Sequence, residues 1–395
     1  MQRIIFLVDM NAFFISCETA RSPELKSKPA AVAGDPKNRS GIILAANYEA
    51  RRFGVKTTMV LHEAKRLCPS LILVPPDREL YSRNSKAVME ILSRYSPIIE
   101  QNSIDEAWMD LTGCEVLFGK PVEIASKIMK DIQDELDLWC SIGISENKFL
   151  AKMASEMKKP QGITEVWLKD IKEKIWPLPV REMYGIGMQT ERKLQNIGIF
   201  TIGDLARSNR DLLNSIFGKY GVEIHQLANG LDSSPVSPEH HHDSKSISRS
   251  TTLPEDITDL EYARTVLLRL AEEVGAEARS CDIKGKTVSI AIKYADFQSV
   301  TRQKSIPATY LTKDIYKAGI ELLEQNWNVR RPVRLLGIGV SNFKEDNEVI
   351  QLSFEDLLGN TNSKRSDEKE EKLEKAMDSI RNRFGHNKIN RAKLM

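Results

Sequence analysis

The first 165 residues alternate short apolar runs with stretches whose apolar positions recur at helical spacing. Runs rich in β-branched residues predict strands at 4–8, 41–46, 71–74, 98–101, 107–111 and 140–144. The helical spacing between them predicts helices at 12–20, 47–53, 78–95, 122–136 and 148–157. This order of elements indicates one α/β layer built on a mixed sheet.

The rest of the chain divides into segments of different pattern. Residues 166–232 contain short helical patterns separated by glycine-bearing turns, and 233–247 are rich in Ser, Pro and His, which is typical of a linker. An α+β pattern returns at 248–342, with strands expected at 247–253, 287–293, 299–306 and 333–340 and helices at 260–279 and 313–326. The tail, 343–395, contains a charge-rich helix at 364–384, which we expect to be a solvated surface helix with one apolar face and an unknown docking partner. That face consists of Leu373, Ala376, Met377, Ile380 and Phe384.

Composition narrows the class of protein. The chain has 395 residues, of which 41% are hydrophobic, so it is not mainly disordered. Its net charge is only +2, which does not by itself require a nucleic acid, a membrane or an acidic partner. The five cysteines are scattered without a C-x-x-C pair, which excludes a zinc ribbon and disfavours a disulfide framework. No apolar run is long enough for a signal peptide or a membrane span, so we expect a cytoplasmic protein.

Carboxylates lie at the ends of predicted strands in the first segment. Asp9 ends the first buried strand, and Asp105 and Glu106 lie where two later strands meet. If these strands are neighbours, the carboxylates converge, and divalent cations would relieve their repulsion. Two hard cations held in this way support in-line phosphoryl transfer. The alternative is that Asp9 caps the helix that begins near Ala12, and that Asp105 and Glu106 lie in a solvated turn.

Groups suited to a triphosphate lie nearby in the sequence. Tyr48 and Arg51 are three residues apart on one helical face, and Lys159 follows the helix at 148–157. Taken singly, each of these side chains is more simply explained as a solvated surface group. Phe13 and Phe14 follow the Asp9 strand; we expect Phe13 in the core and Phe14 on the opposite side.

Five motifs, in order along residues 3–342, carry a family resemblance. They read VDMNAFF, AANYEARRFGV, SIDEAWMD, GISENKFLAKMASEMKKPQGI and YGIG. Together they resemble the Y-family DNA polymerases, in particular the DNA polymerase IV (DinB) type. The resemblance implies a multi-domain α+β right-hand fold: a ferredoxin-like palm with small fingers (about 20–75) in 1–165, a helix-hairpin-helix thumb in 166–232 and an α+β little finger in 248–342.

The same resemblance implies roles for individual residues. Asp9, Asp105 and Glu106 match the metal-binding carboxylates, with the Met10 carbonyl as a further ligand. Tyr48, Arg51 and Lys159 match the triphosphate contacts. Phe14, beside Phe13, matches the steric gate, an aromatic side chain that excludes a 2′-hydroxyl. The family often has Thr where this chain has Ala45, which removes one hydroxyl donor to the triphosphate.

Expected DNA and protein contacts follow from the same match. Gly185 and Gly187 would let thumb backbone amides approach DNA phosphates, although a helix C-cap also explains such glycines. Five basic residues of the little finger could follow a DNA backbone: Lys245, Arg249, Arg302, Lys304 and Arg331. Gln351, Leu352 and Phe354 form part of a peptide similar to the motif by which bacterial polymerases bind the sliding clamp.

The sequence as a whole predicts an error-prone translesion DNA polymerase. It would add dNMPs from dNTPs to a primer 3′-end on template DNA, with two Mg²⁺ ions that Mn²⁺ could replace, and act as a monomer. Two alternatives are a nucleotidyl cyclase on a similar palm and a non-catalytic DNA-binding relative. Synthesis of a cyclic nucleotide without a primer would indicate the first, and a metal-independent effect on replication would indicate the second.

Overall fold

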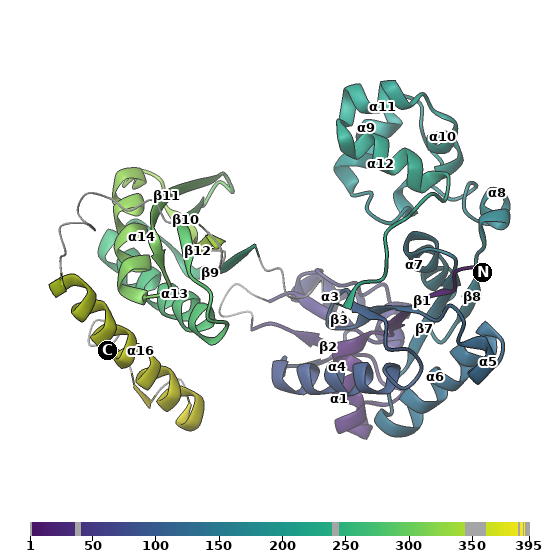
Figure 1. Cartoon of the computed structure of the whole chain (residues 1–395), viewed down its shortest axis with the longest axis horizontal. Helices are drawn as coiled ribbons and strands as arrows, with labels where there is room; N and C mark the ends of the chain where they lie inside the picture. The colour runs from purple at the N-terminus through teal and green to yellow at the C-terminus, as the bar shows by residue number, and fades with distance from the viewer. Residues whose placement is uncertain are drawn as a thin grey trace. The chain divides into compact units, whose positions relative to one another are not determined.

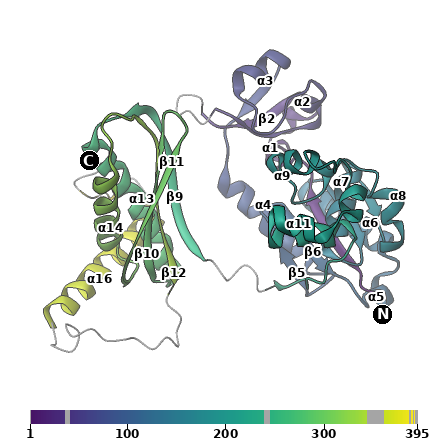
Figure 2. The same ribbon diagram turned by 90° about the horizontal axis from the view of Figure 1, so that it is seen from above.

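The computed structural model describes residues 2–35, 41–238, 245–343, 361–385, 388–389 and 391, and for 361–368 it describes the backbone alone. The chain divides into two compact units, with the described residues up to 238 in the first and those from 245 in the second (Figures 1 and 2). Within these described ranges, no helix combines the length and the apolar character needed to cross a membrane.

A five-stranded sheet forms the centre of the first unit, in the order β5-β6-β1-β7-β8. Its strands are β1 (Ile5–Met10), β5 (Ile99–Gln101), β6 (Glu106–Asp110), β7 (Cys140–Ser145) and β8 (Ile163–Glu165). β1 is antiparallel to both β6 and β7, whereas β7 and β8 are parallel. Every residue of β1 is buried, because other elements cover both faces of the sheet.

The two faces of this sheet carry different elements. Side chains alternate along a strand, so Phe6 and Val8 face one core and Ile5 and Leu7 the other. The first core contains residues of three helices: α1 (Phe13–Arg21), α4 (Arg78–Leu92) and α6 (Pro121–Leu136). Helix α7 (Lys148–Met157) packs on the second face, and the short α5 (Glu115–Phe118) precedes α6. This arrangement is the mixed sheet with helices that the sequence predicted.

Helix α7 lies directly on the backbone of β7 at Gly143. A Cβ atom added there would lie 2.0 Å from the Ala151 carbonyl oxygen and 2.4 Å from the Ser155 amide nitrogen. On its opposite side, α7 contributes Phe149 and Met153 to the core of the following helices. Helix α7 is therefore fixed between the sheet and the helical segment.

A smaller sheet, in the order β3-β2-β4, precedes α4 in the chain. It contains β2 (Ala30–Ala33), β3 (Ile43–Ala46) and β4 (Ile72–Val74), with helices α2 (Tyr48–Arg52) and α3 (Leu61–Leu67). Asn47 caps α2 by accepting a hydrogen bond from the Ala50 amide at 3.0 Å, so the helix begins at Tyr48. The sequence pattern predicted β3, α2 and β4, but it missed β2 and α3.

Residues after β8 form the short helices that the sequence predicted. They are α8 (Ile171–Lys174), α9 (Met188–Gln195), α10 (Ile202–Arg207), α11 (Arg210–Phe217) and α12 (Lys219–Ala228). Gly185 and Gly198 have φ values of 91° and 80°, which side-chain-bearing residues rarely adopt.

The segment after α12 returns to the central sheet, although 233–247 read as a linker. Val236 is buried with Leu7 and Trp108 on the α7 face. The Ser237 amide donates to Glu100 Oε2 at 2.9 Å, and the Lys148 ammonium lies 2.6 Å from Glu100 Oε1. One apolar side chain and one buried ion pair therefore hold the first part of the expected linker in place.

The second unit is a four-stranded antiparallel sheet in the order β11-β10-β12-β9. Its strands are β9 (Ser246–Ile257), β10 (Gly285–Tyr294), β11 (Ser299–Thr309) and β12 (Val333–Phe343). Helices α13 (Leu260–Ser280) and α14 (Thr312–Asn326) share an apolar core with alternate residues of the strands. The predicted strands and helices of this segment, and the α+β fold class, are confirmed.

Helix α16 (Thr361–Phe384) packs against α13, a docking partner that the sequence left open, and it does so mainly through charged side chains. Leu373 and Phe384 are 52% and 59% exposed, whereas Glu374 is 1% exposed. Glu374 pairs with Arg279 of α13, and Arg381 donates to Glu272 at 3.1 Å. The surface of α13 carries Arg279 and Glu272 at this place. The face of α16 with the complementary charges of Glu374 and Arg381 therefore packs against it.

Candidate active site

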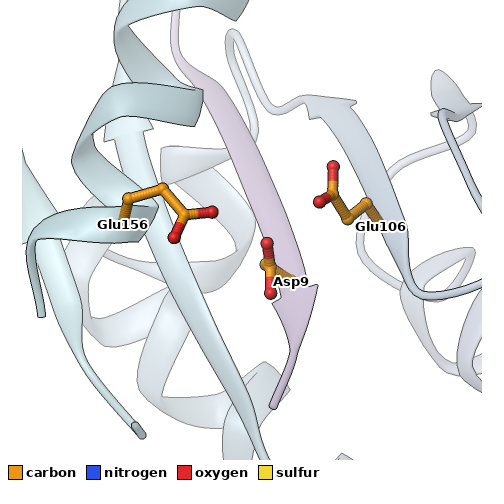
Figure 3. A group of neighbouring side chains, drawn as sticks. All are labelled: Asp9, Glu106 and Glu156. Atoms are coloured by element: carbon orange, nitrogen blue, oxygen red, sulfur yellow. The ribbon is translucent and has the colours of Figure 1, made fainter. Parts of the chain in front are cut away.

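Strand register brings two of the predicted carboxylates together. Asp9 is paired with Glu106 across antiparallel β1 and β6, and alternation places both side chains on the α7 face. Glu156, in the last turn of α7, completes a group whose ligand oxygens lie within 4.8 Å of one another (Figure 3). Ala12 is the N-cap residue of α1 and no side chain caps that end, so Asp9 does not serve as the helix cap.

Two lysines neutralise this group. The Lys152 ammonium lies 3.0 Å from Asp9 Oδ2, 2.7 Å from Glu106 Oε1 and 2.9 Å from Glu156 Oε1. The Lys159 ammonium lies 2.8 Å from Asp9 Oδ1 and 2.9 Å from Glu156 Oε1. The site is therefore a compact arrangement of alternating charges at the end of β1.

Burial and charge act in opposite directions on these groups. Burial raises the pKa of Asp9 above its ordinary value, even though the two lysines oppose the shift. Burial disfavours the charged form of Lys152, but the carboxylates of Asp9 and Glu106 outweigh it and raise the pKa of this ammonium. Lys152 therefore stays positively charged, and its charge offsets the repulsion between the buried carboxylates.

Asp105 lies beside the cluster but outside the three-carboxylate group. Its Oδ1 accepts a hydrogen bond from the Ser103 hydroxyl at 2.7 Å, and its carbonyl oxygen accepts one from the Met10 amide at 2.9 Å. Asp105 therefore joins the end of β1 to the turn before β6. The structure brings Asp9 and Glu106 together as expected, with Asp105 and the Met10 backbone adjacent to them.

The first turn of α2 presents Tyr48 and Arg51 on one face. The Arg51 guanidinium lies 4.9 Å from the centre of the Tyr48 ring, and its Nε donates to the Ala46 carbonyl at 2.9 Å. The buried Tyr48 hydroxyl has no hydrogen-bond partner within the described structure. Burial raises the pKa of Tyr48, and the charges of Arg51 and then Lys159 act against this shift. Ala45, in β3, is buried and offers no hydroxyl.

Phe13 lies in the core as the sequence predicted, whereas Phe14, expected on the opposite side, packs against the edge of the same core. Phe13 is 3% exposed in the main core. Phe14 is only partly buried, and its ring stacks on Tyr81 with centroids 4.5 Å apart and an interplanar angle of 15°. Part of the Phe14 side chain remains exposed to solvent.

Three of the basic residues proposed to contact DNA lie on the helix-covered face of the second sheet. The strand register pairs Arg249 with Ile338, Arg302 with Ile290 and Lys304 with Val288. The three partners Ile338, Ile290 and Val288 belong to the apolar core, so the paired basic residues lie on the same face of the sheet. Arg249 forms an ion pair with Glu277 of α13, and Lys304 forms one with Glu321 of α14.

Arg331 lies 2.7 Å from Asp296, and Lys245 is exposed at the start of this unit. DNA contacts by any of these five residues stay a prediction. The same is true of Gly185 and Gly187, where an added Cβ would meet no atom within 4 Å. Gln351, Leu352 and Phe354 lie outside the described residues.

Sequence reasoning missed Lys152 and Glu156. Both lie on the predicted helix at 148–157, spaced four residues apart and followed by Lys159. That spacing places Lys148, Lys152 and Glu156 on one helical face, a signal that could have indicated their contact with the carboxylates.

Comparison with known proteins places the chain in a family. The sequence matches the impB/mucB/samB family at residues 8–156, the C-terminal domain of that family at residues 244–354 and the IMS family HHH motif at residues 169–199. It is 60% identical over 395 residues to the DNA polymerase IV of Clostridium kluyveri, covering 100% of this chain and 99% of that relative. It is 51% identical over 403 residues to the DNA polymerase IV of Alkaliphilus oremlandii, covering 100% of both.

A solved structure agrees with these relatives. A Y-family DNA polymerase chimera of Dbh and Dpo4 has a TM-score of 0.77 at 28% sequence identity, covering 86% of this chain and 98% of that chain. Sequence and fold therefore agree along nearly the whole chain, and the protein belongs to the Y family of DNA polymerases, in its DNA polymerase IV (DinB) branch.

Proposed function

We propose that the carboxylates at the end of β1 and β6 hold the divalent cations of a translesion DNA polymerase. The observation that carries this proposal is the register pairing of Asp9 with Glu106, which gathers carboxylate oxygens on one face. Carboxylate oxygens are the ligands that Mg²⁺ and Mn²⁺ prefer, so the donor set fits these ions. The Met10 amide donates to the Asp105 carbonyl beside the pair, and we propose the Asp105 carboxylate and the Met10 carbonyl as further ligands.

The proposed reaction joins a dNTP to a primer 3′-end on template DNA. Two bound Mg²⁺ ions, with Mn²⁺ as a substitute, would activate the primer hydroxyl and neutralise the departing pyrophosphate. Asp9, Asp105 and Glu106 are the residues that would hold these ions. Lys152 keeps the carboxylates close together, because its ammonium contacts Asp9 and Glu106 at once.

Three side chains are suited to the triphosphate. Lys159 contacts Asp9 and carries a positive charge next to the carboxylate site, and Arg51 offers a forked donor on the adjacent α2 turn. The orphaned Tyr48 hydroxyl supports this assignment, since a buried donor without a partner is costly unless a ligand satisfies it. Ala45 cannot add a hydroxyl bond, so binding depends on Tyr48, Arg51 and Lys159.

Phe14 is the residue that we propose as the gate against ribonucleotides. Its ring lies on the helix that follows β1, a few residues from Asp9, and is only partly covered. A bulky ring under the sugar leaves no room for a 2′-hydroxyl. We further propose, from the family, that the small β3-β2-β4 layer leaves the nascent base pair open to solvent, which would suit damaged templates.

Other parts of the proposal rest on the sequence. We propose that Gly185, Gly187 and the basic residues of the second unit contact DNA phosphates without reading sequence. We further propose a cytoplasmic monomer that binds the replication sliding clamp through Gln351, Leu352 and Phe354.

Primer extension with dNTPs and Mg²⁺ tests the proposal, on undamaged templates and on templates with an abasic site. Wild type is compared with Glu106→Gln and with Asp110→Asn, which removes a charge at the far end of the same strand. We expect extension on both templates by wild type and by Asp110→Asn, and none by Glu106→Gln.

Equal activity of Glu106→Gln and wild type would contradict the assigned site, and wild-type extension confined to undamaged DNA would contradict bypass. Two alternative functions remain measurable in the same assay. A cyclase would form cyclic nucleotide without primer, and a non-catalytic relative would bind DNA without extending it. Neither is favoured, because relatives that match the whole chain are named DNA polymerase IV.

A further inference from the structure

The ring of Phe14 has a defined support on one side. Helices α1 and α4 pack against each other, and the Tyr81 ring of α4 lies parallel to that of Phe14 at a centroid distance of 4.5 Å. Phe13 contacts Phe14 only at a tilted angle, with centroids 5.9 Å apart. Tyr81 is therefore the flat surface against which the partly exposed Phe14 ring rests.

Tyr81 is itself held in place by a buried carboxylate. Its hydroxyl donates to Glu18 Oε1 at 2.7 Å, and both residues are 1% exposed. Burial and then the Glu18 carboxylate raise the pKa of the Tyr81 phenol, so this group is protonated and can donate. The second Glu18 oxygen accepts from Arg21, whose other nitrogen pairs with Asp77 at 2.7 Å.

The spacing on α1 joins these contacts into one unit. Glu18 lies four residues after Phe14, and Arg21 lies three residues after Glu18. This helical spacing places all three on the face of α1 that meets α4. Phe14 cannot turn toward α4 while the Tyr81 ring fills that space, and Tyr81 cannot turn without breaking its bond to a buried carboxylate. The hydrogen bond deep in the core thus restricts a ring at the edge of the substrate site.

We infer that Tyr81 is a positioning residue for sugar selection: held by Glu18, it supports the Phe14 ring in the orientation that excludes a 2′-hydroxyl. This inference rests on the proposed role of Phe14 as the gate. Tyr81 touches neither substrate nor cation, and it acts only through Phe14. Its removal therefore weakens discrimination between dNTP and rNTP only while Phe14 is present.

The test measures kcat/KM for insertion of a dNTP and of the matching rNTP. Phe14→Ala should lose most discrimination, and Tyr81→Leu should lower it about two- to tenfold, the range by which an aromatic stack biases a conformational equilibrium. Tyr81→Phe keeps the ring face and should retain more discrimination than Tyr81→Leu. In the Phe14→Ala background, Tyr81→Leu should change the ratio no further.

Tyr95→Leu is the matched control. Tyr95 belongs to the same core, and its hydroxyl donates to Asp131 at 2.6 Å, but its ring packs on Phe118 instead of Phe14. We expect wild-type discrimination from this variant. If Tyr81→Leu fails to fold, Tyr81→Met removes the ring while filling the core, and the same comparison applies.

The possible failures are distinguishable. Intact discrimination in Phe14→Ala would overturn the gate assignment, and with it the inference. Loss in Phe14→Ala together with wild-type discrimination in Tyr81→Leu would overturn only the role of Tyr81. An equal loss from Tyr81→Leu with and without Phe14 would also overturn it, because the effect would then not pass through the gate.

Discussion

The contact of α7 with β7 makes Gly143→Ala a sharp test of how the site is positioned. The added methyl group would lie 2.0 Å from the Ala151 carbonyl oxygen and 2.4 Å from the Ser155 nitrogen, both backbone atoms of α7. No side-chain rotation can relieve these contacts. Helix α7 must therefore move away from the sheet by on the order of 1 Å to restore normal van der Waals separation.

Such a shift acts on both stability and catalysis. Overpacking of this kind costs about 1–3 kcal/mol of unfolding free energy. Helix α7 carries Lys152 and Glu156, which lie 3.0 Å or less from carboxylate or ammonium partners in the site. Because a displacement of about 1 Å in a catalytic arrangement can cost on the order of 10²-fold in rate, we expect a kcat/KM loss of about that size.

Urea unfolding and single-nucleotide insertion kinetics measure the two effects. Gly319→Ala is the matched control, since its Cβ would lie 2.5 Å from Cδ1 of Ile338, the end of a flexible side chain that can rotate away. We expect Gly319→Ala to retain activity within about threefold, with a stability change below about 1 kcal/mol. A Gly143→Ala enzyme with wild-type kinetics and stability would refute the reasoning.

Three further predictions concern other parts of the chain. Glu100→Ala removes the ion-pair partner of the buried Lys148 ammonium and should lower the free energy of unfolding, measured in urea, by about 3 kcal/mol. Replacing both Glu100 and Lys148 by methionine should recover most of this loss. Equal stability of Glu100→Ala and wild type would contradict the prediction. Arg279→Ala removes the ion pairs that join α13 to Glu374 and Asp378 of α16, so it should speed proteolytic cleavage within α16 at least about tenfold, whereas removing the exposed Lys375 should not; unchanged cleavage would exclude the charged docking face. Hydrogen bonds from Thr201 lower the pKa of Asp204, so this carboxylate stabilises α10 above its unfolded pKa and loses that effect as pH falls through the lower folded value. The thermal-midpoint difference between wild type and Asp204→Asn should therefore be full at neutral pH and should narrow as the pH falls below the ordinary aspartate pKa of 3.8; a constant difference would contradict the linkage.

Several parts of the fold and site were predictable because their signals are local. The strand at 4–8 is a continuous apolar run, the strand at 140–144 has apolar residues at alternate positions, and the helices at 78–95 and 122–136 repeat apolar residues at helical spacing. β2 was missed because Ala30–Ala33 has little β-branched character and is a strand only through its partners β3 and β4.

The sequence by itself determined the order of elements, the position of Asp9 and Glu106 at strand ends, and the family. Tertiary structure alone decided that Glu156 and Lys152 join these carboxylates, that Val236 returns to the sheet, and that α16 docks by charge. The physical reason is that periodicity reports which side of an element is apolar, but not which element will cover it. Pairing across β1 and β6, and the close approach that Gly143 permits, connect residues far apart in the chain, so no local pattern contains them.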